Sequence, residues 1–215
     1  MRRLADSRGF TLVELVIAMP MLAIVLGGLT VVMLQMNSSS RKQQELATLQ
    51  TEARSALELM ETDVREGFAG DGTGPIRTAT ATSIEVWSPD NYPLSVSGGT
   101  LSSFHDRDIT YTVSSGSLTK TIKTSTNTYP NLSSPPWAWG TSSTTTLLGS
   151  ISNTDIFTYY TSAGIQANPD VPLTFPISSP YGIVAVGIKL TLTYKGPNPT
   201  SFTITGLVSM RDPYG

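Results

Sequence analysis

Several residue types that build active sites are absent or scarce in this chain. There is no cysteine among its 215 residues, which excludes disulfide bonds, thiolate nucleophiles and cysteine-bound zinc. The single histidine, His105, leaves too few imidazoles for most metal sites and acid–base networks. Charged residues make up only 14%, against about 25% in typical soluble proteins. The net charge is −2, and acids and bases are nearly balanced after Gly67, so no basic surface for nucleic acid is evident.

Recognisable catalytic motifs are missing as well. His105 stands in FHDRD, where Asp106 or Asp108 could accompany it, but no nucleophile elbow, phosphate loop or His-Glu-X-X-His pattern occurs. We interpret this cluster as a solvated turn, and we expect neither enzymatic activity nor a cofactor. Asp71 in GDGTG and the two aspartates near His105 are the available calcium donors. Their spacing is not that of an EF-hand, so no metal site is predicted.

Long uncharged runs, in contrast, are present. Residues 15–34 carry no charge, and twenty helical residues span about 30 Å, the thickness of a bilayer's hydrocarbon core. Arg2, Arg3 and Arg8 precede the run, which predicts a single pass through the lipid bilayer, with a cytoplasmic N-terminus and the rest outside. A cleaved secretory signal is the alternative. Its apolar region would be shorter, about 7–15 residues, whereas this run leads directly into a further helical pattern.

Glu14 is an unexpected residue at the start of this apolar segment. A carboxylate at the centre of a bilayer costs roughly 2.5–3.5 kcal/mol or more, so it normally has a partner or a function. In an ordinary anchor, Glu14 would be protonated or would lie at the level of the lipid headgroups. The residues before it favour a more specific explanation.

The stretch Arg8-Gly9-Phe10-Thr11-Leu12-Val13-Glu14 resembles the class III leader of type IV pilins and pseudopilins. The resemblance implies that prepilin peptidase cuts after Gly9 and that the new amino group of Phe10 is methylated. It also implies that Glu14 pairs with the freed amino terminus of a neighbouring subunit during assembly. Partners would then include other pilins or pseudopilins and a membrane assembly platform. The close match covers roughly residues 8–19.

Pro20 lies inside the predicted membrane helix. Proline removes one backbone hydrogen bond and crowds the carbonyl four residues earlier, here that of Val16, so we expect a kink or local melting there. The Gly27-Gly28 pair is a second weak point in the same helix.

The chain turns polar after Gln35 without a strong helix breaker, and apolar residues continue at helical spacing. Gly67 and Gly70 then end the pattern. We therefore expect one helix from near Phe10 to Glu66, embedded in lipid over 10–35 and packed on a head over 36–66. The predicted packing stripe consists of Leu46, Leu49, Ala53, Ala56, Leu57, Met60 and Val64.

Residues 67–215 are expected to form a β-rich head outside the cytoplasm. Short alternating segments between Gly, Pro, Asn and Ser residues predict strands, with a hairpin turning at residues 114–116 and another at 196–198. Residues 124–146 show no clear period and are interpreted as a long exposed loop. The predicted strands are Ser83–Trp87, Asp108–Val113, Ser117–Lys123, Ile156–Tyr160, Ile183–Tyr194 and Phe202–Met210.

Two tryptophans, Trp137 and Trp139, fall within the predicted loop. The simpler interpretation is that the indoles fix the loop to the body of the head. The other is that they form an interface with a neighbouring subunit or a target, because exposed tryptophans often anchor interfaces.

The order of these segments, including Asp63-Val64-Arg65 near the helix end, is similar to PilW-type minor pilins and J-type pseudopilins of type II secretion. That resemblance implies an α+β pilin-like fold, in which a leader of residues 1–9 is followed by a long N-terminal helix that packs on a mainly antiparallel sheet. It implies a minor subunit that starts a filament or forms its tip, in a type IV pilus, competence pilus or secretion pseudopilus. The alternative is a membrane-anchored binding or adhesion domain with an uncleaved helix.

Overall fold

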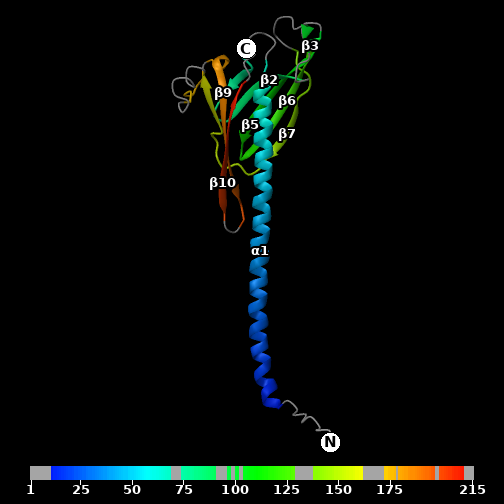
Figure 1. Ribbon diagram of the computed structural model, residues 1–215, viewed down its shortest axis with the longest axis vertical. Coiled ribbons are helices and arrows are strands. Elements are labelled where there is room, and N and C mark those ends of the chain that lie inside the picture. Colours follow the sequence, from blue (N-terminus) through cyan, green and yellow to red (C-terminus); the bar gives the residue numbers. More distant parts are fainter. Residues whose placement is uncertain are drawn as a thin grey trace. The chain divides into compact units, whose positions relative to one another are not determined.

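One long helix and an antiparallel β-rich head make up the fold (Figure 1). The computed structural model describes residues 11–68, 74–90, 96–97, 100–101, 104–128, 138–161, 172–177, 179–196 and 199–210. The chain divides into two compact units, Met1–Ala47 and Thr48–Gly215. Helix α1 (Leu12–Arg65) has 54 residues and contributes to both units. The predicted long helix is therefore confirmed over its described part.

Helix α1 continues without interruption past its weak points. The helical pattern runs through Pro20 and through the polar segment at residues 37–40. In that segment the Ser38 hydroxyl donates a hydrogen bond to the carbonyl of Gln35 at 2.8 Å, which keeps the hydroxyl satisfied within the helix. Local melting does not occur at Pro20, and a kink there stays a prediction.

The larger sheet of the head has five antiparallel strands in the order β1-β2-β5-β6-β7. A two-stranded sheet pairs β3 (Val96–Ser97) with β4 (Thr100–Leu101). The five strands are β1 (Ile76–Ala79), β2 (Ser83–Pro89), β5 (His105–Ser114), β6 (Ser117–Thr128) and β7 (Ser143–Leu148).

A second sheet has three antiparallel strands in the order β10-β9-β8, and a short 3-10 helix, η1 (Pro180–Gly182), precedes its central strand. All six strands predicted from the sequence are confirmed, with small differences at their ends. The strands of this sheet are β8 (Phe157–Thr161), β9 (Ile183–Tyr194) and β10 (Thr200–Ser209).

The predicted hairpin between β5 and β6 turns where the sequence indicates. Ser114 pairs with Ser117, and the two residues between them, Ser115 and Gly116, have φ angles of 51° and 76°. Positive φ at both central positions is the geometry that matches the right-handed twist of the flanking strands. The later turn at residues 197–198 lies outside the described residues, but β9 and β10 pair antiparallel as expected.

The long loop predicted over residues 124–146 is only partly correct. Strand β6 extends to Thr128, and β7 begins at Ser143, so both ends of that segment belong to the sheet. These ends are rich in threonine, whose β-branched side chain suits a strand even where hydrophobic and polar residues do not alternate. The pattern-based prediction failed because pairing, rather than periodicity, defines these strand ends.

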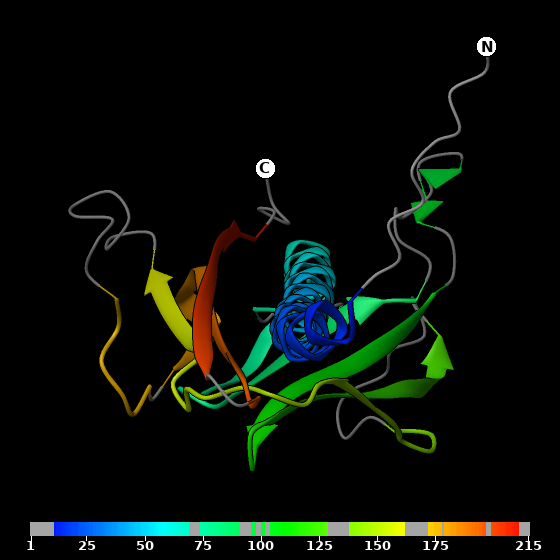
Figure 2. The same ribbon diagram turned by 90° about the horizontal axis from the view of Figure 1, so that it is seen from below.

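The head part of α1, residues 48–65, lies between the two sheets (Figure 2). Ala53, Ala56, Met60 and Val64 are buried there, and Leu49 and Leu57 are partly buried against the same core, which confirms the predicted stripe from Leu49 to Val64. The same core contains inward-facing residues of both sheets, including Ile84, Ile109, Leu118, Tyr159, Val186 and Leu190. Burial of this one-sided stripe holds the C-terminal third of α1 to the head.

Candidate functional site

The N-terminal end of α1 forms a reciprocal cap. The Glu14 backbone N–H donates to Thr11 Oγ1 at 3.3 Å, and the Thr11 N–H donates to Glu14 Oε2 at 3.1 Å. The Thr11 hydroxyl also donates to Glu14 Oε2, at 3.1 Å. This arrangement is a capping box, in which a Thr and a Glu three residues apart satisfy otherwise unpaired backbone groups. The sequence contains this Thr-X-X-Glu pattern, but a cap was not among the roles expected for Glu14.

The apolar side chains in the first part of α1 are exposed rather than buried. Between Leu12 and Met36, the large hydrophobic residues are 50–79% exposed. Within the described residues, α1 is the one helix that is long and apolar enough to cross a membrane, and its most apolar window is not buried in the protein. A helix that is apolar on all sides requires lipid or other apolar helices around it.

The first part of this apolar helix overlaps a segment that matches a known family. Residues 4–30 match the family described as a prokaryotic N-terminal methylation motif. The match supports a type IV pilin or pseudopilin. Together with the apolar helix, it supports membrane anchoring with the head outside. It implies processing by prepilin peptidase and assembly with other pilins. No curated protein and no solved structure matches the chain.

The predicted site residues fall in different parts of the chain. Glu14 and Pro20 lie on α1, whereas Gly9, Phe10 and Trp137 lie outside the described residues. Trp139 is half-buried and forms an isolated bridge with Ser125. The pilin-type residues are thus confined to the N-terminal segment, and Trp139 belongs to the sheet.

Trp139 packs on the body of the head. Its ring meets that of Trp87 edge-on, with centroids 5.0 Å apart and an interplanar angle of 71°. The Arg77 guanidinium carbon lies 3.8 Å from the Trp87 ring centroid. Such aromatic and cation–π contacts contribute about 0.5–1.5 kcal/mol each beyond area burial. This geometry favours the interpretation that Trp139 fixes its segment to the head, and a role for it in an interface stays a prediction.

A buried ion pair connects α1 to the larger sheet. Lys120 Nζ lies 2.5 Å from Asp63 Oδ2, and the Tyr111 hydroxyl donates to the same oxygen. Asp63 is 5% exposed and Lys120 9% exposed. Asp63 was expected only as part of the family pattern Asp63-Val64-Arg65, and Lys120 was not predicted. A signal existed, because Lys120 interrupts the inward-facing row Leu118-X-Lys120-X-Ile122 on β6.

Burial and the charges of this ion pair shift the pKa values of neighbouring groups. Burial raises the pKa of Tyr111, and the Asp63 carboxylate raises it further, so the phenol stays protonated and acts as a hydrogen-bond donor. Burial also raises the pKa of Glu66, and the nearby Asp63 adds to this, while Arg107 and Lys120 act in the opposite direction. The last turn of α1 therefore ends in a charged cluster packed against β5 and β6.

The interpretation of residues 105–108 as a solvated turn is wrong. His105, Asp106 and Asp108 lie on strand β5, and both aspartates are buried. Lys123 Nζ lies 3.2 Å from Asp108 Oδ2, so a cross-strand ion pair allows this carboxylate to be covered. Burial raises the pKa of Asp108, Glu85 raises it further, and Lys123 lowers it. No group of three His, Asp or Glu residues suited to a metal occurs among the described residues.

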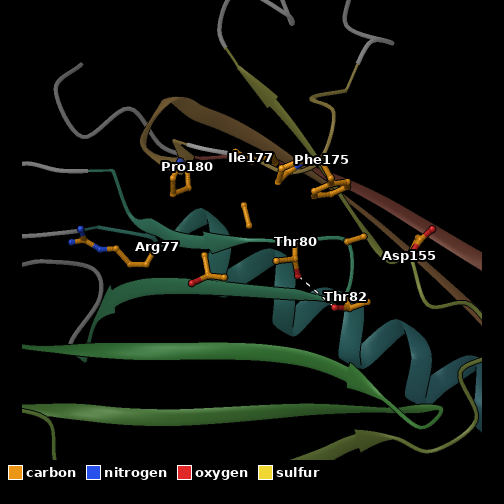
Figure 3. A pocket seen from close by; sticks show the side chains of 11 residues that line it. Arg77, Thr80, Thr82, Asp155, Phe175, Ile177 and Pro180 are labelled. Carbon is orange, nitrogen blue, oxygen red and sulfur yellow. Dashed lines mark hydrogen bonds between the residues drawn. The ribbon is translucent and has the colours of Figure 1, made fainter.

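A hollow of about 830 Å³ runs beside strand β1 (Figure 3). Residues 77–82 form one side, Phe175, Ile177 and Pro180 form the other, and Arg77 and Asp155 lie at opposite ends. The Thr80 and Thr82 hydroxyls are 3.5 Å apart. Among the described residues, the lining of the hollow has one carboxylate, that of Asp155, and no histidine.

Proposed function

We propose that this chain is the precursor of a minor pilin-like subunit that starts a filament or lies at its tip. Prepilin peptidase would cut after Gly9, and Phe10 would then be methylated. The observation that carries the proposal is a helix with exposed apolar side chains that has Glu14 in its first turn and Gly9 and Phe10 shortly before it in the sequence. A plain membrane anchor needs a similar helix and can use Glu14 as a helix cap, but it does not need the Gly9-Phe10 pair of a prepilin cleavage site.

Assembly would give Glu14 a new partner. In the single chain its carboxylate accepts hydrogen bonds from the backbone and hydroxyl of Thr11. A carboxylate has about four acceptor sites, so these bonds leave it incompletely satisfied in lipid. The amino terminus of a neighbouring subunit would add an opposite charge in a medium of low dielectric, where such attraction is strong. A pairing of this kind favours one stagger between adjacent helices.

The topology follows from the flanking charges. Arg2, Arg3 and Arg8 would keep the leader in the cytoplasm, where the peptidase and the assembly platform act, and the β-rich head would lie outside. The filament would be a type IV pilus, a competence pilus or a type II secretion pseudopilus. The similarity of segment order to PilW-type pilins and J-type pseudopilins supports a role in initiation or at the tip.

The first test is the intact mass and N-terminal residue of the membrane-extracted protein, made with and without prepilin peptidase. We expect a mature chain beginning at N-methylated Phe10 only when the peptidase is present. Gly9→Val should block cleavage, and the matched control Ser7→Val should not. A chain that keeps Met1 despite an active peptidase would support the alternative, a permanently anchored binding domain.

The minor role requires a separate measurement. Deletion of the gene should reduce the number of filaments per cell without changing the length distribution of those that remain. Complementation with Glu14→Ala should fail, and complementation with a head-surface variant such as Thr203→Ala should succeed. Unchanged filament numbers after deletion would refute a role in initiation.

A further inference from the structure

The two outer strands of the five-stranded sheet are protected very differently. Strand β1 has four residues, a register irregularity between Ile76 and Thr78, and η1 lying beside it. Strand β7, at the other edge, pairs with β6, and no other strand of the described chain pairs with its outer side. Its sequence, Ser-Thr-Thr-Thr-Leu-Leu, has neither a charge nor a proline. Natural edge strands usually carry such features because bare backbone groups attract other strands.

The unprotected edge extends beyond β7 itself. Further along β6, the Thr126 N–H donates to the Ala138 carbonyl, and the Gly140 N–H donates to that of Thr124. Residues 138–140 and β7 therefore follow one another along the same side of β6, and residues 140–146 are exposed. The pairing of β6 with β7 is regular from Ser143 to Thr146 and becomes irregular only near Leu147. The edge thus offers regular extended backbone to a partner.

Side chains beside this edge indicate what kind of strand would fit. A hollow of about 270 Å³ lies between α1 and β7, lined by Leu147 with Thr51, Glu52, Ser55, Ala56 and Leu59 of the helix. A strand added to β7 would point alternate side chains toward this hollow and the others toward the solvent-facing side of the sheet. On that side, threonines of neighbouring strands already form cross-strand pairs, such as Thr121 and Thr144 with hydroxyl oxygens 2.9 Å apart.

We propose that the edge formed by residues 138–148 binds an extended strand of a partner protein by β-strand addition. The partner strand would have apolar residues and one basic residue on the side that faces the hollow, opposite Leu147 and Glu52, and small hydroxyl residues on the other side. Main-chain hydrogen bonds would supply affinity, and the alternate side chains would supply selectivity. The surface is separate from the apolar half of α1, so it does not depend on the proposed processing at Gly9.

Strand β6, which pairs with the other side of β7, already has this pattern of side chains. Its residues 117–123 present Leu118, Lys120 and Ile122 on one face and Thr119 and Thr121 on the other. A synthetic peptide of this sequence, Ser-Leu-Thr-Lys-Thr-Ile-Lys, is therefore a suitable probe. Added to the outer edge, it would direct its leucine, its first lysine and its isoleucine toward the hollow that contains Glu52.

Binding would be measured by fluorescence anisotropy, with the labelled peptide added to the full chain in detergent. Two further peptides would carry N-methyl groups on alternate backbone nitrogens, one peptide on its odd-numbered residues and the other on its even-numbered residues. In strand addition, alternate backbone N–H groups face the partner, so we expect only one phase to weaken binding, by about ten-fold or more. No detectable binding of the parent peptide, or an equal loss in both phases, would overturn the proposal.

Position would be tested by disulfide trapping, which the absence of native cysteine makes specific. We expect Thr145→Cys to capture a cysteine-containing version of the peptide, and the matched Thr78→Cys variant at the β1 edge to capture at least five-fold less. Both threonines are exposed, so neither change should disturb folding. Trapping that favours Thr78→Cys would overturn the proposal. So would disulfide-linked homodimers of Thr145→Cys in place of peptide capture, because the occupant would then be a second copy of this chain.

Discussion

The ion pair between Asp63 and Lys120 allows a quantitative test of how α1 is held to the head. We predict that Lys120→Met lowers the free energy of unfolding by about 3–5 kcal/mol, because it leaves the Asp63 carboxylate buried without its countercharge. Both residues are less than 10% exposed, so solvent screening reduces this cost little. For a head of this size, the melting temperature would fall by about 6–20 °C.

The matched control is Lys123→Met on the same strand. Lys123 pairs with Asp108 at 3.2 Å, but its side chain is 40% exposed, so water can replace part of the lost interaction and the loss should be smaller than for Lys120→Met. Unfolding in urea would be followed by tryptophan fluorescence of the full chain in detergent, since the buried Trp87 reports on the head.

A double variant separates the charge from the packing. Asp63→Leu combined with Lys120→Met removes both charges and should recover at least half of the loss, because an apolar pair leaves no buried charge. The Tyr111 hydroxyl would still lose its acceptor, so full recovery is not expected. The reasoning is refuted if Lys120→Met and Lys123→Met have equal effects, or if the double variant is less stable than Lys120→Met.

Three further predictions concern other parts of the chain. Gly67→Ala should destabilise the head by about 1–3 kcal/mol in urea unfolding, because a Cβ there would lie 3.0 Å from both the Val64 carbonyl oxygen and the Pro75 Cβ, whereas Gly149→Ala, with open space around it, should have little effect. Thr11→Ala should remove about 1 kcal/mol of capping energy and speed amide exchange in the first turn of α1, and Thr11→Ser should not; equal exchange would contradict the cap. Because the pKa of Asp108 is raised in the folded state, its contribution to stability is complete below its ordinary pKa of 3.8 and is lost as the pH rises through the higher folded pKa. Asp108→Asn should therefore flatten the pH dependence of the free energy of unfolding in that range. An unchanged pH profile would contradict this.

The helix could be predicted from the sequence because its two signals are strong. Residues 15–34 carry no charge over a membrane's thickness, and the stripe through Ala53, Met60 and Val64 repeats at helical spacing. Strand β9 was equally clear, because apolar residues alternate with other residues from Val186 to Tyr194. In each case, one local pattern is enough to define the element.

Elements that depend on distant partners could not be predicted in the same way. Strand β1 is four residues long, and β7 consists largely of threonine, so neither shows a clear alternation of apolar and polar residues. The cluster at His105 looked like a solvated turn because its charges are adjacent in sequence. Pairing with β6 supplies Lys123 to Asp108, and this allows the carboxylate to be buried in the sheet. Contacts of this kind join residues far apart in the chain, and no local pattern encodes them.

Two carboxylates of α1 interrupt its apolar surfaces, and the difference between their partners separates folding from assembly. Asp63 receives a lysine and a tyrosine from the sheet of the same chain, so its charge is compensated once the head folds. Glu14 is bonded within its own chain to Thr11 and, in the described residues, meets no countercharge. A buried charge is stable only where its partners are complete. We therefore expect the countercharge of Glu14 to come from a neighbouring subunit in the proposed assembly, which makes this residue a natural starting point for the contact between helices.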